Sequence, residues 1–153
     1  MSSPSSSADQ PSASGLPSPA LLGFDPGREK CGLAIVGLDR VLHYHEVVPV
    51  ISVPSTIQNL RSQYAVSSIV MGDQTGSARW KKELSALPNA LRITLVDERY
   101  SSLEARDRYW EMYPPKGLTK LMPQSLRSIP RPIDDIVAIL LVERYLKRLS
   151  GED

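Results

Sequence analysis

The chain is poor in the residues that build disulfide frameworks and thiolate metal sites. It has one cysteine, Cys31, and two histidines, which excludes an internal disulfide and a zinc-type cluster of thiolates. Such sparing use of cysteine is typical of proteins in a reducing compartment, so we expect a cytoplasmic protein. Cys31 itself lies within an apolar run and is expected in the core.

Long apolar runs and an excess of one charge are also missing. The longest apolar run, residues 136–142, has seven residues and is far too short to span a membrane. No basic segment followed by an apolar one stands at the N-terminus, so we expect no secretory signal. Because the net charge is +1, any contact with nucleic acid must depend on the local distribution of charge.

What the chain does contain is a Ser/Pro-rich stretch followed by a domain-sized segment. Residues 1–20 are almost entirely Ser, Pro, Ala and Gly. They cannot bury enough apolar surface to offset chain entropy, so we predict a disordered tail. Residues 21–150 are sufficient for one domain with a sizeable core.

Hydrophobic periodicity and turn signals predict an α/β order of elements. A strand that ends at Asp25 and a second strand at residues 31–38 form a hairpin, and residues 41–50 add a third antiparallel strand. Strands at residues 68–72 and 91–96 then alternate with helices. Four helices are predicted. The first ends near residue 64, and the other three cover residues 78–87, 101–113 and 133–149.

Three of the helix starts carry a serine that could cap the helix. Ser55 precedes Gln58 by three residues and Ser101 precedes Glu104 by three, as in a capping box. Ser77 is expected to cap the helix at residues 78–87, although the amides at that helix start could instead receive a phosphate.

Two histidines stand in the predicted third strand. His43 and His45 are separated by one residue, so strand alternation places them on one face. Two imidazoles could hold a metal ion, but no cysteine, third histidine or clear carboxylate partner accompanies them. A polar strand face is therefore the favoured interpretation.

Carboxylates recur where predicted elements begin or end. Asp25 ends the first strand, Asp97 and Glu98 follow the strand at residues 91–96, and Asp134 and Asp135 open the last helix. Each also has an ordinary role, because Asp-Pro-Gly favours a turn and acids favour helix N-termini. Neighbouring residues point to opposite faces of a strand and differ by about 100° around a helix, so only one of each pair can face a shared site.

A shared site for three such carboxylates would require a cation. Like charges repel when crowded, and ligation by oxygen alone suits Mg²⁺ or Mn²⁺. Acid clusters of this kind support metal-assisted phosphoryl chemistry.

Residues 114–132 contain five prolines, four basic residues and no acid. Regular secondary structure over the whole segment is not expected. A basic loop without compensating acids suits contact with phosphates, and a solvated connector is the alternative.

Three segments of the chain resemble signature blocks of the YqgF/RuvX family. They are FDPGREKCGLAI at residues 24–35, VDERYSSLEAR at residues 96–106 and IDDIVAILLVERYL at residues 133–146. This family comprises proposed Holliday junction resolvases and nucleases for the precursor of the small-subunit ribosomal RNA. The resemblance implies a ribonuclease H-like fold, with a mixed five-stranded sheet flanked by helices. Its first three strands would be antiparallel and the next two parallel.

The same resemblance implies the roles of individual residues. Asp25, Glu98 and Asp134 would be catalytic and would hold Mg²⁺ or Mn²⁺, with Asp135 as the alternative to Asp134. Asp97 would point away from the metal. The candidate nucleic-acid contacts are Arg79, Lys81, Arg99, Lys116, Lys120, Arg127 and Arg131.

We therefore expect a metal-dependent endonuclease that acts on structured RNA, such as the 5′ end of pre-16S rRNA, or on branched DNA. Ribosomal precursor particles are candidate partners for an RNA nuclease, whereas a junction resolvase would need a symmetric homodimer. A non-catalytic RNA- or ribosome-binding module with the same fold is one alternative. An ATP-handling domain of the actin and sugar-kinase type is another, but it would need a second domain to close over the nucleotide.

Overall fold

The computed structural model describes residues 18–74 and 76–151, which form an α/β fold around a five-stranded mixed sheet. Strands β1 and β2 form an antiparallel hairpin to which β3 adds antiparallel, while β4 and β5 extend the sheet parallel to β1. The sheet order is β3-β2-β1-β4-β5. These features confirm the predicted α/β class and the predicted mixed sheet. The strands are β1 (Pro19–Asp25), β2 (Lys30–Gly37), β3 (Leu42–Pro49), β4 (Ala65–Gly72) and β5 (Arg92–Val96).

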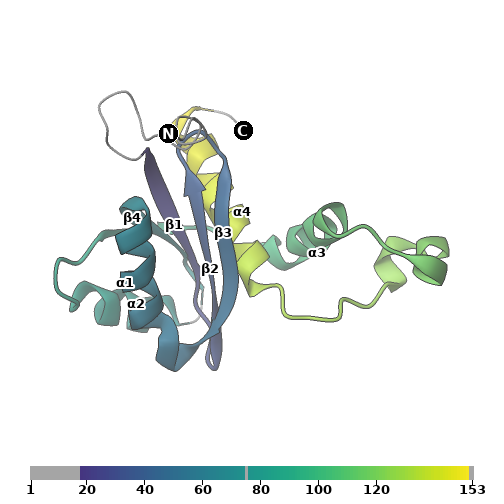
Figure 1. Ribbon diagram of the computed structural model, residues 1–153, viewed down its shortest axis with the longest axis horizontal. Helices are drawn as coiled ribbons and strands as arrows, with labels where there is room; N and C mark the ends of the chain where they lie inside the picture. Colours follow the sequence, from purple (N-terminus) through teal and green to yellow (C-terminus); the bar gives the residue numbers. More distant parts are fainter. Residues whose placement is uncertain (1–17, 75, 152–153) are drawn as a thin grey trace, which may run out of the picture.

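Helices cover both faces of the sheet (Figure 1). Helices α1 (Val53–Gln63) and α2 (Ser77–Ser85) lie on one face, and α4 (Asp134–Leu149) lies on the other, where α3 (Ser101–Met112) packs beside it. Within the described ranges, no helix combines the length and the apolar character needed to cross a membrane.

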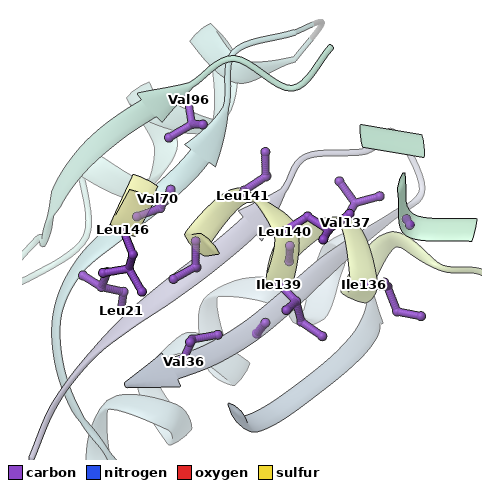
Figure 2. Packing of buried hydrophobic residues seen from close by; sticks show 14 of the residues in the cluster. Leu21, Val36, Val70, Val96, Ile136, Val137, Ile139, Leu140, Leu141 and Leu146 are labelled. Atoms are coloured by element: carbon purple, nitrogen blue, oxygen red, sulfur yellow. The ribbon is translucent and has the colours of Figure 1, made fainter. Parts of the chain in front are cut away.

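Strand alternation divides the buried side chains between two clusters. In β1, Leu21 packs towards α4, whereas Leu22 and Phe24 pack with α1 and α2. Figure 2 shows the α4 side, where residues of β1, β2, β4 and β5 meet the apolar stretch of α4. Residues 136–142 of α4 are all buried, as expected for a helix that is apolar all round.

Two glycines allow α4 to lie directly on the central strands. A Cβ atom on Gly23 would lie 2.3 Å from the carbonyl oxygen of Ala138, and one on Gly32 would lie 1.9 Å from that of Asp134. Both contacts are impossible for a real side chain. The absence of side chains at these positions therefore sets how closely α4 approaches the sheet.

Residues 114–132, which we call the arm, connect α3 to α4. They contain only two short 3-10 turns, η3 (Gly117–Leu121) and η4 (Gln124–Leu126), so the expected lack of regular structure is confirmed. Together with α3, the arm projects to one side of the sheet (Figure 1).

All three predicted serine caps are wrong. Helix α1 begins at Val53, because Pro54 is tolerated in a first turn, and the Ser55 hydroxyl instead donates to the Ser52 carbonyl at 3.1 Å. Ser77 and Ser101 are the first helical residues, after Gly76 and Tyr100, which have φ angles of 92° and 63°. In α2 and α3, a residue with a left-handed backbone turns the chain into the helix, and no side chain caps the helix start.

The prediction that His43 and His45 share one face is also wrong. Ile35 pairs with Tyr44 and Val36 pairs with Leu42, so His43 is an extra residue in β3. The His43 ring lies 5.8 Å from the ring of Tyr64, which packs against the α1 and α2 cluster, whereas His45 contacts α4. A bulge therefore reverses the alternation at this point.

The predicted disordered tail falls mainly on residues 1–17, which lie outside the described residues. Pro19 and Ala20, which were also assigned to the tail, are the first residues of β1. Cys31 is fully buried, as expected.

Candidate active site

The candidate site lies at the edge of the sheet where β1, β4 and β5 end. Asp25 is the last residue of β1, Glu98 follows the last residue of β5 by two positions, and Asp134 is the first residue of α4. Because β1, β4 and β5 are parallel, their carboxyl ends meet at this edge. Three elements that are distant in sequence thus each deliver a carboxylate to one place.

Glycines on neighbouring strands make room for these groups. Gly32 pairs with Asp25 across the hairpin, and the backbone of Asp134 occupies the space that a Gly32 side chain would need. At the end of β4, a Cβ atom on Gly72 would lie 2.3 Å from the Glu98 Oε1 atom. The sequence therefore leaves space at this edge for α4 and for the Glu98 carboxylate.

The three carboxylates interact electrostatically. Burial and, to a smaller extent, the nearby charges of Glu98 and Asp134 together raise the pKa of Asp25 from 3.8 to about 8. Asp25 is the most enclosed of the three, and a pKa of about 8 favours its protonated form at neutral pH. Once Asp25 is neutral, it no longer repels the other two.

Glu98 is anchored across the loop that follows β4. Its Oε1 atom accepts a hydrogen bond from the Gln74 backbone N–H at 3.0 Å. Burial raises the pKa of Glu98, and the nearby carboxylate of Asp73 adds to this, whereas Gln74 and Arg144 lower it. Asp73 is thus a fourth acid near the site.

Asp134 stands beside the hairpin turn. Burial is the main cause that raises its pKa, and the ammonium group of Lys30 opposes the change. An open groove of about 360 Å³ adjoins it, lined by Gly27, Arg28, Glu29, Lys30 and Asp134. Arg28 and Lys30 were not predicted as site residues. Their position in the turn directly after Asp25 was the available signal, because a hairpin turn lies beside the strand ends that it joins.

Asp97 and Asp135 do not join the acid cluster. Asp97 is exposed, and its carboxylate accepts hydrogen bonds from the backbone N–H and the side chain of Arg99. These bonds lower the pKa of Asp97. Asp135 is fully buried, with its Oδ2 atom 2.7 Å from Nδ1 of His45 and 2.6 Å from Nη2 of Arg131. Of the two acids at the start of α4, the structure therefore directs Asp134 to the site and places Asp135 in an ion-pair network with β3.

The predicted nucleic-acid contacts are dispersed over three regions. Arg79 and Lys81 lie on the exposed surface of α2, where Arg79 pairs with Glu83. Arg99 follows β5 next to Glu98, in a second open groove of about 380 Å³. The remaining four, Lys116, Lys120, Arg127 and Arg131, belong to the arm.

Two of the arm residues already have partners within the chain. The Arg127 guanidinium lies 5.4 Å from the centre of the Trp110 ring and donates to the Met122 carbonyl. Arg131 is held by Asp135. Lys116 and Lys120 are exposed and have no ion pair within residues 18–74 and 76–151, so they are the arm cations most available to a phosphate.

The carboxylates at the site are suitable ligands for a hard divalent cation such as Mg²⁺. Their donor atoms are carboxylate oxygens, and their mutual repulsion at Asp25 is the interaction that a bound divalent cation would relieve. Across the described ranges, no three His, Cys, Asp or Glu side chains are already arranged around one metal position. The carboxylates are thus close enough to influence one another's ionisation without forming a closed cage.

Comparison of the chain with protein-family models and with curated protein sequences finds no match. The assignment of a function therefore depends on the geometry of this site and on the resemblance of the three sequence segments.

Proposed function

We propose that this chain is a divalent-metal-dependent phosphodiesterase that acts on structured nucleic acid, built on a ribonuclease H-like fold. The observation that carries the proposal is the convergence of Asp25, Glu98 and Asp134 from β1, β5 and α4. A structural role would not need a carboxyl group whose pKa is raised to about 8, because a group that must stay protonated in the folded state lowers stability at neutral pH. Such costs are typical of sites that bind a ligand.

Asp25, Glu98 and Asp134 are the residues that would hold Mg²⁺ or Mn²⁺. When bound there, such an ion supplies Lewis-acid stabilisation for the charge that develops on a phosphodiester during hydrolysis. The chain itself contributes the rest of the arrangement. The Gln74 amide fixes the Glu98 carboxylate, and the ammonium group of Lys30 beside Asp134 provides a positive charge for the nucleic-acid backbone.

The cations around the site support a backbone-directed mode of binding. Arg28 and Lys30 line the groove beside Asp134, Arg99 lines the groove beside Glu98, and Lys116 and Lys120 extend the positive charge along the arm. Binding that depends on such contacts weakens steeply as salt rises. It carries no base sequence information, which suits recognition of a nucleic acid by shape.

A cleavage assay with a matched control tests the proposal. The full chain is incubated with Mg²⁺ or Mn²⁺ and either a four-way DNA junction or a structured precursor RNA. Asp25→Asn should abolish cleavage, whereas Asp97→Asn should retain it, because Asp97 is exposed and turned towards Arg99. Paired symmetric cuts in the junction identify a resolvase, and cuts confined to the RNA identify a processing nuclease.

The alternative is a binding module that keeps the fold without the chemistry. In that case neither substrate is cut, or Asp25→Asn cuts as well as the wild-type chain, although binding to RNA persists. An ATP-handling domain is separated from both by nucleotide binding measured with calorimetry.

A further inference from the structure

The groove between the end of β5 and α4 has an aromatic side chain that the proposed chemistry leaves without a role. Tyr100 is 73 % exposed and lines this groove together with Arg99, Arg144 and Arg148. Within the described ranges, no aromatic or cationic side chain stacks on the Tyr100 ring. An aromatic ring is therefore exposed to solvent at a groove whose other lining residues include three arginines and two acids.

The backbone at Tyr100 is held in an unfavourable conformation. Its φ angle is 63°, in the left-handed region that side chains larger than Asn or Asp rarely adopt. Such a conformation persists only where the surroundings enforce it, and it is concentrated at sites of function. Glycine would relieve the strain at this position, so the presence of an aromatic ring calls for a reason.

Arg144 of α4 holds the backbone next to Tyr100 in place. Its guanidinium donates to the carbonyl of Asp97 at 2.7 Å and to the carbonyl of Arg99 at 2.9 Å, and it also pairs with Glu104. These bonds fix the backbone on both sides of Glu98 and immediately before Tyr100. One side chain therefore anchors the backbone from which both Glu98 and Tyr100 project.

Arg148 gives the groove an available positive charge. Its guanidinium lies 5.5 Å from the centre of the Tyr145 ring and forms no ion pair among residues 18–74 and 76–151. The other two arginines of the groove are paired with Asp97 and Glu104. A ligand that carries both a negative charge and a flat apolar face matches this combination.

We propose that Tyr100 is a stacking platform for an unpaired base of a nucleic-acid strand, with Arg148 facing a phosphate of that strand. The inference rests on the proposed function, because it assigns an unpaired nucleotide of the bound nucleic acid to a groove lined by the two neighbours of Glu98 in the chain, Asp97 and Arg99. Consecutive residues of an extended chain advance at most about 3.6 Å, so the backbones of Glu98 and Tyr100 lie within about 7 Å of each other. The groove therefore starts near Glu98 along the chain, but the Glu98 side chain does not line it, so a base stacked on Tyr100 lies outside the acid cluster.

Binding measured without any divalent cation tests this inference separately from cleavage. The full chain is titrated, in the presence of a chelator, into a single-stranded oligonucleotide that carries 2-aminopurine, and into the same oligonucleotide annealed as a blunt duplex. RNA and DNA versions are compared, because both offer an unpaired base and a phosphate. The variants are Tyr100→Leu, which keeps the apolar bulk and the strained backbone, and Tyr100→Phe, which keeps the ring.

We expect Tyr100→Leu to bind the single strand about 5- to 100-fold more weakly than the wild type and to lose the quenching of 2-aminopurine fluorescence. Tyr100→Phe should bind within about twofold of the wild type, since the ring carries the interaction. Binding to the duplex should change little in either variant. Arg148→Ala should lower the slope of the salt dependence, because one phosphate contact is lost.

The inference is overturned if Tyr100→Leu binds the single strand as tightly as the wild type, or if it weakens duplex binding equally. It is also overturned if the wild-type chain does not bind single strands. Because Tyr100 is exposed, an unchanged thermal midpoint will show that the variants are folded. If ring-dependent binding is found but no substrate is cut, the nuclease proposal fails while the stacking site stands.

Discussion

Replacement of Asp25 by Asn should make the protein more stable at neutral and alkaline pH while it removes the proposed activity. In the folded chain Asp25 has a pKa of about 8, compared with 3.8 for an ordinary aspartate. The folded state therefore binds this proton more tightly than the unfolded state does. The associated stability is fully present below pH 4 and is lost as the pH rises towards 8 and beyond.

The difference between the two pKa values sets the size of the effect. At about 1.4 kcal/mol for each pH unit, it corresponds to about 6 kcal/mol between acidic and alkaline conditions. This is an upper value, because the carboxylate stands at the edge of the sheet and solvent screens part of its charge. We expect Asp25→Asn to be more stable than the wild type by about 2–4 kcal/mol at alkaline pH. The two should be nearly equal below about pH 4.

Urea denaturation in the presence of a chelator, repeated between about pH 4 and pH 9, measures this difference. Asp97→Asn serves as the control, because Asp97 is exposed and its pKa is lowered by Arg99. If the difference in unfolding free energy between the wild type and Asp25→Asn is the same at every pH, the reasoning is refuted. Added Mg²⁺ should stabilise the wild type at alkaline pH and should affect Asp25→Asn much less, because a ligand stabilises only the state that binds it.

Three further predictions follow from the packing. Gly32→Ala should destabilise the fold by about 3 kcal/mol, since its Cβ atom would meet the Asp134 carbonyl. Gly37→Ala is the control in the same chemical denaturation, because there the added carbon meets side chains, the Asp39 carboxylate and the His43 ring, and no backbone; equal costs would contradict the argument. Asp135→Asn should cost about 3 kcal/mol in thermal unfolding because it leaves the Arg131 guanidinium without its buried counterion, and a neutral result would contradict that role. Burial raises the pKa of the Cys31 thiol, so a disulfide reagent should label it only when the chain unfolds; rapid labelling of the native protein would be inconsistent with the structure.

Local sequence was a sufficient guide to much of the fold. Apolar runs bounded by turn residues predicted all five strands and four long helices, because strand and helix periods depend on side chains that are close in sequence. The boundaries were less accurate. The three serines at helix starts satisfied the capping pattern, yet neighbouring residues with left-handed or proline-restricted backbones began the helices instead.

The bulge at His43 illustrates a feature that no periodic pattern contains. Alternation places His43 and His45 together, whereas the register of β3 on β2 separates them. Register depends on the pairing of two strands, so it is a property of the sheet and not of the strand sequence.

For the candidate site, the sequence by itself determined the carboxylates and their positions at the ends of elements. It left open which of Asp134 and Asp135 faces the site, since either could do so on a free helix. The tertiary structure decided this through the contact between α4 and the sheet. Gly23 and Gly32 let α4 approach the strands closely, and His45 and Arg131 bind the side chain of Asp135. Helix rotation is fixed by packing against another element, and that contact joins residues that are far apart in the chain.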